Sequence, residues 1–199
     1  MKILLVGATG SIGEVAYEEL KNDAEIIQAS RNSLEYPIDI TSEESIKALF
    51  EKVGEVDAII CAAGSAHFAT VDELTPEQNM IAVNSKQLGQ VNLVLIGLHY
   101  LKDHGSITLT TGVLMDDPLK TASSSAMANG GVSAFVKSAA IEMPRGIRIN
   151  HVSPSMVEKS KEKYGKLFQG FQPVSSERIG LAYRKSVFGA QTGQAYNVY

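Results

Sequence analysis

The chain has 199 residues, of which 44% are hydrophobic, and it carries a formal net charge of -4 and a single cysteine, Cys61. This length suits one domain over residues 1–199 that buries about 70% of the surface of its unfolded chain, and the negative charge argues against a nucleic-acid partner. One cysteine excludes an intrachain disulfide, and the apolar run at residues 3–6 is too short for a signal peptide or a membrane span, so we expect a cytoplasmic protein without a membrane partner.

Short apolar runs alternate with amphipathic segments along the chain. Residues 3–6 form an apolar run that ends in glycines, as a buried parallel strand does, and a helix through Val15 and Leu20 follows it. The further predicted strands are residues 25–30, 37–40, 56–62, 106–111, 148–153 and 195–198. The further predicted helices are residues 42–53, a bent or broken segment at 77–101, and residues 123–143. Strands in alternation with helices predict an α/β fold, with a parallel sheet covered on both faces.

The glycine-rich segment Gly7-Ala-Thr-Gly-Ser-Ile-Gly13 lies directly between the first predicted strand and the first predicted helix. Glycines in such a turn let the backbone approach a pyrophosphate, and the free N–H groups at the start of the helix bind its charge. A plain glycine turn is the alternative. The strand-to-helix context favours nucleotide binding.

Further segments of the chain follow one another in the order and spacing of a known family. They are Asp39-Ile-Thr41, Cys61-Ala-Ala-Gly64, Asn84, residues 147–154 and Thr192-Gly-Gln194. Together with the glycine turn, this set resembles the short-chain dehydrogenase/reductase family over nearly the whole chain, although Ser11 stands where the family commonly has its second glycine. The resemblance implies a Rossmann-type doubly wound parallel sheet in a single three-layer domain.

The resemblance also implies a nicotinamide dinucleotide cofactor and the residues that contact it. Asp39 would meet the adenine amino group, although an exposed aspartate in a turn is the alternative. The implied contact residues are Gly7, Thr9, Gly10, Ser11, Ile12, Gly13, Ser30, Arg31, Asp39, Ile40, Ala62, Ala63, Gly64 and Pro154.

The end of the second predicted strand favours NADP over NAD. An acidic residue there would accept the ribose hydroxyls of NAD, but the chain has Ser30, Arg31 and Asn32. A guanidinium without a neighbouring carboxylate suits a 2'-phosphate, and a solvated surface arginine is the alternative.

In this family a tyrosine transfers the substrate proton, a lysine four residues later lowers the pKa of the tyrosine, a serine orients the carbonyl, and an asparagine supports the proton relay. The resemblance places Ser125 at the tyrosine position and Asn129 at the lysine position, and both depart from the family's pattern. The serine position falls at Gly112, with Thr111 adjacent, and Asn84 fills the asparagine position. The implied catalytic residues are therefore Asn84, Thr111, Ser125 and Asn129, and no metal is expected.

Ser125 and Asn129 differ strongly in acidity and charge from the groups that they replace. A serine hydroxyl is a much weaker acid than a phenol, and a neutral asparagine gives no positive field to a phenolate. Positioned general acids and bases contribute about 10²- to 10⁴-fold to a rate, so ordinary carbonyl reduction should be slow without them.

Other side chains could replace the missing proton donor. His67, Lys120 and Tyr164 each lie in a segment that could reach the site, Tyr164 in a polar stretch typical of a small helical lid, although each is more often an ordinary surface side chain. Lys86 is a poor candidate, because two residues along a helix from Asn84 it should point to the opposite side.

The pair Gly130-Gly131 interrupts a predicted helix, at a cost of roughly 1 kcal/mol for each glycine relative to alanine. A close approach by a cofactor or by a partner helix would explain the pair. Members of the resembled family commonly associate through this helix and its neighbour, so we expect a homo-oligomer, either a dimer or a tetramer.

The preferred function is an NADP(H)-dependent oxidoreductase with a non-standard proton source, acting on a small-molecule substrate that the sequence does not identify. The alternative is a catalytically silent NAD(P)-binding protein that acts as a sensor or binds a partner, which accounts more directly for the missing tyrosine and lysine. A different reaction on the bound cofactor, such as a lyase or epimerase step, has no positive support.

Overall fold

A computed structural model describes residues 1–199 of the chain, apart from the side chain of Lys163. One parallel sheet contains six strands in the order β2-β1-β3-β4-β5-β6. The strands are β1 (Lys2–Val6), β2 (Glu25–Ala29), β3 (Val56–Cys61), β4 (Leu101–Thr110), β5 (Arg148–Pro154) and β6 (Ala195–Val198). The predicted Rossmann-type α/β fold with a doubly wound parallel sheet is therefore confirmed.

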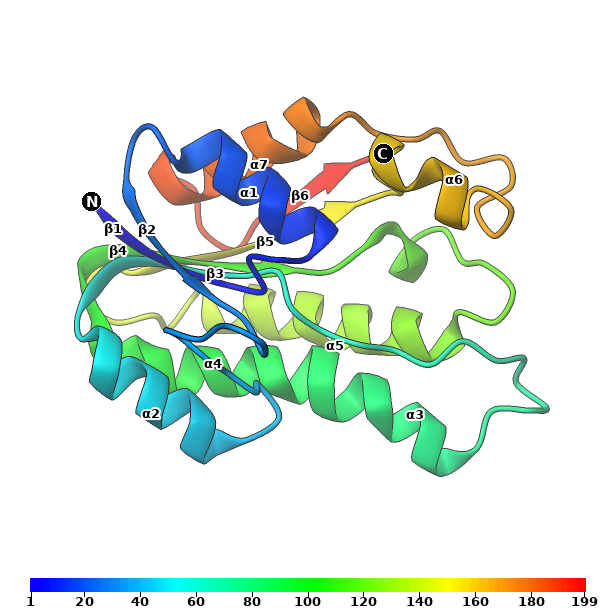
Figure 1. Ribbon diagram of the computed structural model, residues 1–199, viewed down its shortest axis with the longest axis horizontal. Helices are drawn as coiled ribbons and strands as arrows, with labels where there is room; N and C mark the ends of the chain where they lie inside the picture. The colour runs from blue at the N-terminus through cyan, green and yellow to red at the C-terminus, as the bar shows by residue number, and fades with distance from the viewer.

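Helices cover both faces of the sheet (Figure 1). On one face lie α1 (Ser11–Leu20) and α7 (Ser176–Phe188), and on the other lie α2 (Glu43–Val53), α4 (Gly89–Gly97) and α5 (Ser123–Ala139). The shorter helical segments are α3 (Pro76–Ala82), the π-helix η1 (Val83–Leu88), α6 (Lys161–Tyr164), and the 3-10 turns η2 (Leu98–Tyr100), η3 (Val113–Met115) and η4 (Glu158–Ser160). None of the helices in the described part of the chain is long and apolar enough to cross a membrane.

Strand β1, which lies between β2 and β3, shows why the apolar runs in the sequence are continuous. Leu4 and Val6 belong to the core that contains Phe50 of α2, whereas Ile3 and Leu5 belong to the core on the opposite face. Side chains of a strand alternate between the two faces of a sheet, and here both faces are covered. Residues 3–6 of this strand are therefore all apolar.

The strand predicted at residues 37–40 is wrong. Only an isolated bridge joins Ser30 to Pro37, so β2 is the last strand at this edge of the sheet. Pro37 has no N–H group, and the N–H of Asp39 donates to the hydroxyl of Ser45 at 2.9 Å. The N–H of Ile38 does donate to the carbonyl oxygen of Ser30 at 3.2 Å, but the chain turns there, since the N–H of Ser33 donates to the same oxygen, and β2 offers no further residues for pairing.

The segment predicted as a bent helix at residues 77–101 is broken by the π-helix η1. Buried or partly buried side chains recur every four residues at Ala82, Lys86, Gln90 and Val94. An α-helix has 3.6 residues per turn, so a four-residue repeat drifts around its axis, and the wider π-turn compensates for the drift. The buried side chains of the segment therefore keep facing the protein interior. The segment ends at η2, and β4 begins directly after it at Leu101.

Helix α7 was missed by the sequence prediction, although the sequence contains its signals. The side chain of Ser175 accepts a hydrogen bond from the N–H of Arg178 and caps the helix, and Ile179, Tyr183 and Val187 follow at intervals of four residues. All three of these side chains are buried in the core shared with α1. The predicted extents of β4 and α5 also differ from the structure, because β4 begins at Leu101 and α5 ends at Ala139.

The chain order of the strands creates the crevice in which a ligand can bind. From β1 the chain moves outward to β2 on one side, and then returns to β3 on the other side of β1. The connections beyond the carboxyl ends of β1 and β3 therefore diverge, and ligands of open α/β sheets bind at such a point.

Candidate functional site

The glycine turn after β1 is closed by contacts that only glycine permits. Gly7 has a φ of 84°, and a Cβ atom at this residue would lie 2.8 Å from the backbone nitrogen of Ala63. A Cβ atom at Gly13 would lie 2.0 Å from the carbonyl oxygen of Gly7. These two glycines let β1, β3 and the start of α1 approach one another at the backbone level.

Helix α1 begins without a side-chain cap at this crevice. Gly10 is the N-cap residue, and no side chain accepts a hydrogen bond from the first turn. In contrast, Ser42 caps α2 and Ser175 caps α7 through their hydroxyls. Uncapped N–H groups and the positive end of the helix dipole favour an anion at the start of α1.

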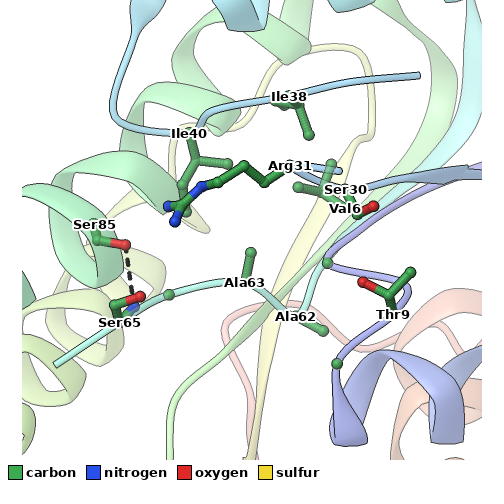
Figure 2. A pocket seen from close by; sticks show the side chains of 13 residues that line it. Val6, Thr9, Ser30, Arg31, Ile38, Ile40, Ala62, Ala63, Ser65 and Ser85 are labelled. Carbon is green, nitrogen blue, oxygen red and sulfur yellow. Dashed lines mark hydrogen bonds between the residues drawn. The ribbon is translucent and has the colours of Figure 1, made fainter. Parts of the chain in front are cut away.

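A cavity of about 250 Å³, which we call the glycine-turn cavity, lies at this point. Its lining residues are Val6, Gly7, Thr9, Gly10, Ser30, Arg31, Ile38, Ile40, Ala62, Ala63, Gly64, Ser65 and Ser85. The structure thus brings together nine of the residues implied by the resemblance. It adds Val6, Ile38, Ser65 and Ser85, of which Ser85 accepts a hydrogen bond from the N–H of Ser65 at 3.1 Å (Figure 2).

Arg31 and Asp39 are placed differently with respect to this cavity. The side chain of Arg31 extends across it from the end of β2, past Ile40 and toward Ser85 (Figure 2). Asp39 is not among the lining residues, and its carboxylate accepts hydrogen bonds from the N–H and hydroxyl of Thr41 at 2.9 and 2.8 Å. These bonds lower the pKa of Asp39 and describe a local turn, which was the alternative interpretation of this residue.

A second and larger cavity of about 510 Å³, which we call the α5 cavity, lies beside the start of α1. Its polar or small lining residues are Ser11, Lys86, Thr111, Gly112, Ser125, Asn129, Pro154, Ser155, Ser160 and Tyr164. Its apolar lining residues are Ile12, Phe68, Val113, Leu114, Met156, Val157, Leu167 and Phe168. The cavity therefore has a cluster of polar groups and an extensive apolar wall.

Helix α5 presents Ser125 and Asn129 to this cavity from successive turns. Ser125 is 6% exposed and Asn129 is 2% exposed, and the Oδ1 atom of Asn129 has no hydrogen-bond partner among the described residues. A buried oxygen without a donor is unfavourable, so this atom suits a ligand that carries a hydroxyl or N–H group. A Cβ atom at Gly112 would lie 3.5 Å from Nδ2 of Asn129, which leaves room for a small side chain.

Thr111 lines the α5 cavity, but its hydroxyl is hydrogen-bonded to the side chain of His151 on β5. Oγ1 lies 2.8 Å from Nδ1 of His151, which is buried beneath it. Burial lowers the pKa of His151 to about 4, so the imidazole is neutral at neutral pH. Nε2 of His151 has no partner among the described residues. No local pattern around Thr111 or His151 predicts this pair.

The π-helix η1 presents Lys86 to the α5 cavity and exposes Asn84 to solvent. The sequence predicts that Asn84 faces the site and that Lys86 points away from it, and the structure shows the reverse orientation, since Asn84 is exposed and lines neither cavity. The two residues do point in different directions, but Lys86 is the one that lines the cavity. Of the other suggested proton donors, Tyr164 lines the cavity, whereas His67 and Lys120 are not among its described lining residues.

Gln90 fixes the backbone of η1 to the end of β4. Its Nε2 donates to the carbonyl oxygens of Lys86 and Thr110 at 3.0 and 2.9 Å, and its Oε1 accepts from the N–H of Thr110 at 2.9 Å. Gln90 is fully buried. The position of Lys86 is therefore tied to the strand that leads into Thr111.

The close approach expected at the glycine pair of α5 comes from the chain itself. A Cβ atom at Gly131 would lie 2.6 Å from the side-chain amide of Gln87, which belongs to η1. A Cβ atom at Gly130 would meet no atom within 4 Å. Neither a cofactor nor a partner helix is needed to explain Gly131.

Comparison with a family model and with a curated relative covers most of the chain. The family model described as Enoyl-(Acyl carrier protein) reductase matches residues 7–184. An uncharacterized oxidoreductase from Staphylococcus epidermidis is 25% identical over an alignment of 179 residues, which covers 78% of this chain and 77% of that protein.

Two solved structures share the whole architecture. The crystal structure of the protein lin1944 from Listeria innocua has a TM-score of 0.98 at 55% identity, with 100% of both chains covered. The crystal structure of a small-chain dehydrogenase in complex with NADPH has a TM-score of 0.88 at 27% identity, and the match covers 100% of this chain and 96% of that one.

Proposed function

Since the chain belongs to the short-chain dehydrogenase/reductase family, we propose that it is an NADP(H)-dependent oxidoreductase with a non-standard active site. In this proposal, Ser125 and Asn129 stand in place of the family's tyrosine and lysine. The main support is that the two cavities adjoin at neighbouring residues, Gly10 with Ser11 and Ser85 with Lys86. A dinucleotide can then reach from one cavity into the other.

The chain's residues fit such a cofactor at both ends of this crevice. The glycine turn and the start of α1 would hold the pyrophosphate, and Ile12 and Pro154 would flank the nicotinamide end. The free Oδ1 of Asn129 would accept a hydrogen bond from a ribose hydroxyl. When bound, the reduced nicotinamide supplies a hydride to the substrate.

Arg31 would make NADP the preferred cofactor by pairing with its 2'-phosphate. A charge-assisted hydrogen bond contributes about 1.5–3 kcal/mol, so Arg31→Ala should weaken NADPH binding by roughly 10- to 100-fold and leave NADH binding nearly unchanged. Fluorescence titration with both cofactors measures this, and Arg178→Ala, at an exposed position on α7, is the matched control. Wild-type protein that binds NADH as tightly as NADPH would contradict the preference.

The apolar wall of the α5 cavity supports an aldehyde, ketone or quinone with an apolar body as substrate. Oxidation of NADPH in the presence of a panel of such compounds tests the oxidoreductase directly. A protein that binds NADPH with saturation and turns over none of them would instead be the silent sensor or partner-binding protein. Absence of saturable binding of either cofactor would refute both functions.

The homo-oligomer stays a proposal, as does the cytoplasmic location. Exposed apolar side chains on α3, η1, α4 and α5 support an association through this face. They are Met80, Ile81, Leu88, Leu95 and Met127. Sedimentation that finds only monomer at micromolar concentration would contradict a dimer or tetramer.

A further inference from the structure

Lys86 is one of the residues that line the α5 cavity. It is partly buried, and its aliphatic stem packs so closely on Gly64 that a Cβ atom there would lie 2.9 Å from Cγ of Lys86. It lines the cavity together with Ser125 and Asn129. A lysine at the surface normally keeps its ammonium in water, so this placement requires an explanation.

No charged partner explains the position of Lys86. Among the described residues, no carboxylate lies within ion-pair distance of it. The nearby Cys61 is also buried, which raises the pKa of its thiol to about 11 and leaves it uncharged at neutral pH. Burial accordingly lowers the pKa of Lys86. The fold thus carries the cost of an uncompensated cation at the cavity wall.

The backbone of Lys86 is fixed, so its position is built into the fold. Its carbonyl oxygen is held by Gln90, which also clamps both backbone groups of Thr110 at the end of β4. The neighbouring Ser85 is held by the N–H of Ser65 in the loop after β3. The end of β4 and the loop after β3 therefore hold the π-helix η1 in the position that directs Lys86 to the cavity.

We propose that Lys86 is a catalytic residue, whose ammonium contacts the carbonyl oxygen of the substrate in the α5 cavity and donates the proton that this oxygen requires. The inference rests on the proposed oxidoreductase function. The reduced nicotinamide supplies the hydride for the carbonyl carbon, and Lys86 supplies only the proton. An N–H bond of the ammonium breaks, an O–H bond forms on the product alcohol, and the neutral amine regains a proton from water.

Lys86 is a better proton donor than the other polar groups of the cavity. A serine hydroxyl such as that of Ser125 is a far weaker acid than an ammonium, and the amide of Asn129 does not donate a proton at neutral pH. An ammonium that burial has made more acidic is suited to general acid catalysis near neutral pH. Tyr164 lines the cavity from α6 and is 41% exposed, so it is the competitor that an experiment must exclude.

Three variants separate these roles: Lys86→Met, Lys86→Arg and Tyr164→Phe, with Lys47→Met on the exposed face of α2 as the control. We expect Lys86→Met to lower kcat for a carbonyl substrate at least 100-fold, with the Kd for NADPH changed less than tenfold. In the wild type, kcat for reduction should fall as the pH rises through the lowered pKa of Lys86, and this fall should move to higher pH in Lys86→Arg.

A stability measurement distinguishes a catalytic lysine from a structural one. Lys86→Met should raise the Tm at pH 7, because it removes a cation without a counter-charge. The increase should shrink as the pH rises toward 10.5, the ordinary pKa of lysine, where the unfolded chain also loses this proton. A lysine that serves only to hold the fold would give the opposite sign.

Nuclear magnetic resonance supplies a readout that is independent of turnover. After reductive methylation with ¹³C-formaldehyde, the Lys86 signal is identified by its absence from Lys86→Arg. We expect it to titrate below 10.5, the ordinary pKa of lysine, and to shift when NADPH is added, whereas the Lys47 signal does not respond to NADPH.

Failure of the inference and failure of the proposed function give different results. Wild-type protein that neither binds NADPH nor reduces a carbonyl overturns the function. An active wild type overturns the inference if Lys86→Met is equally active, if Tyr164→Phe alone abolishes turnover, or if the Lys86 signal titrates at 10.5 or above and does not respond to NADPH. Wild-type protein that binds NADPH without reducing any carbonyl also overturns the inference.

Discussion

The two cavities are built in different ways. The glycine-turn cavity is shaped by backbone, since Gly7 and Gly13 allow contacts that any side chain would block. The α5 cavity is shaped by side chains that come from separate segments, with Lys86 on η1, Ser125 on α5 and Tyr164 on α6. A binding site made by backbone is fixed by a short local motif, whereas a reactive site made by side chains can change its chemistry while the fold is kept.

The largest expected effect on stability and on cofactor binding is at the glycine-turn cavity. Gly13→Ala places a Cβ atom 2.0 Å from the carbonyl oxygen of Gly7, so the turn must open. We expect a loss of at least about 3 kcal/mol in the free energy of unfolding, together with loss of NADPH binding. Gly10→Ala is the matched control for the unfolding measurement, because its Cβ atom would meet that oxygen at 3.4 Å with a φ of -84°, whereas Gly10 itself lines the cavity and is no control for cofactor binding. Urea unfolding of both variants and cofactor titration of Gly13→Ala provide the test, and wild-type behaviour of Gly13→Ala would contradict it.

A smaller effect on stability is expected from the protonation of His151, which is buried beneath Thr111 at the α5 cavity. The pKa of His151 is about 4 in the fold, against 6.5 for an ordinary histidine, so the unfolded chain binds a proton between these values and the folded chain does not. The free energy of unfolding should therefore decrease as the pH falls from 6.5 toward 4, by up to about 3 kcal/mol from this group.

Urea unfolding between pH 6.5 and 5, where most carboxylates are still ionised, measures this dependence. His151→Gln should flatten it, and His99→Gln, at an exposed position on η2, should preserve it. An unchanged slope in His151→Gln would show that His151 is not the group responsible.

The smallest effect concerns the two glycines of α5. Gly130→Ala meets open space and should stabilise the protein by about 0.5–1 kcal/mol through helix propensity. Gly131→Ala gains the same propensity but must displace the side chain of Gln87, so its net effect should be near zero or unfavourable. Thermal unfolding measures the stability of both variants. Equal stabilisation would show that the side chain of Gln87 moves aside with no loss of free energy of unfolding.

The sequence was sufficient for the features that depend on local rules. Gly7 and Gly13 were identified because a turn between a strand and a helix restricts the residue type, and the β1 run was identified because a strand covered on both faces is apolar throughout. Ser125 and Asn129 line the same cavity, as expected for residues four apart on one α-helix, and their catalytic role stays a prediction.

The features that depend on tertiary contacts were not predicted. Lys86 was misplaced because the resemblance was taken to direct Asn84 to the site, whereas Gln90 and Thr110 hold the π-turn so that Lys86 lines the cavity. His151 lies under Thr111 only because β4 and β5 are paired. Helix α7 is a different case, because Ser175 and the four-residue repeat from Ile179 were visible in the sequence and were overlooked.

The π-turn at Val83–Leu88 also shows how the lining of the α5 cavity can change while the fold is kept. Adding or removing one residue in a helix rotates everything on one side of the change by about 100° relative to the other side. A single-codon insertion or deletion therefore exchanges the side chain that faces the α5 cavity without altering any amino acid already there. In related chains, aligning this segment by residue type alone would pair positions that face different directions.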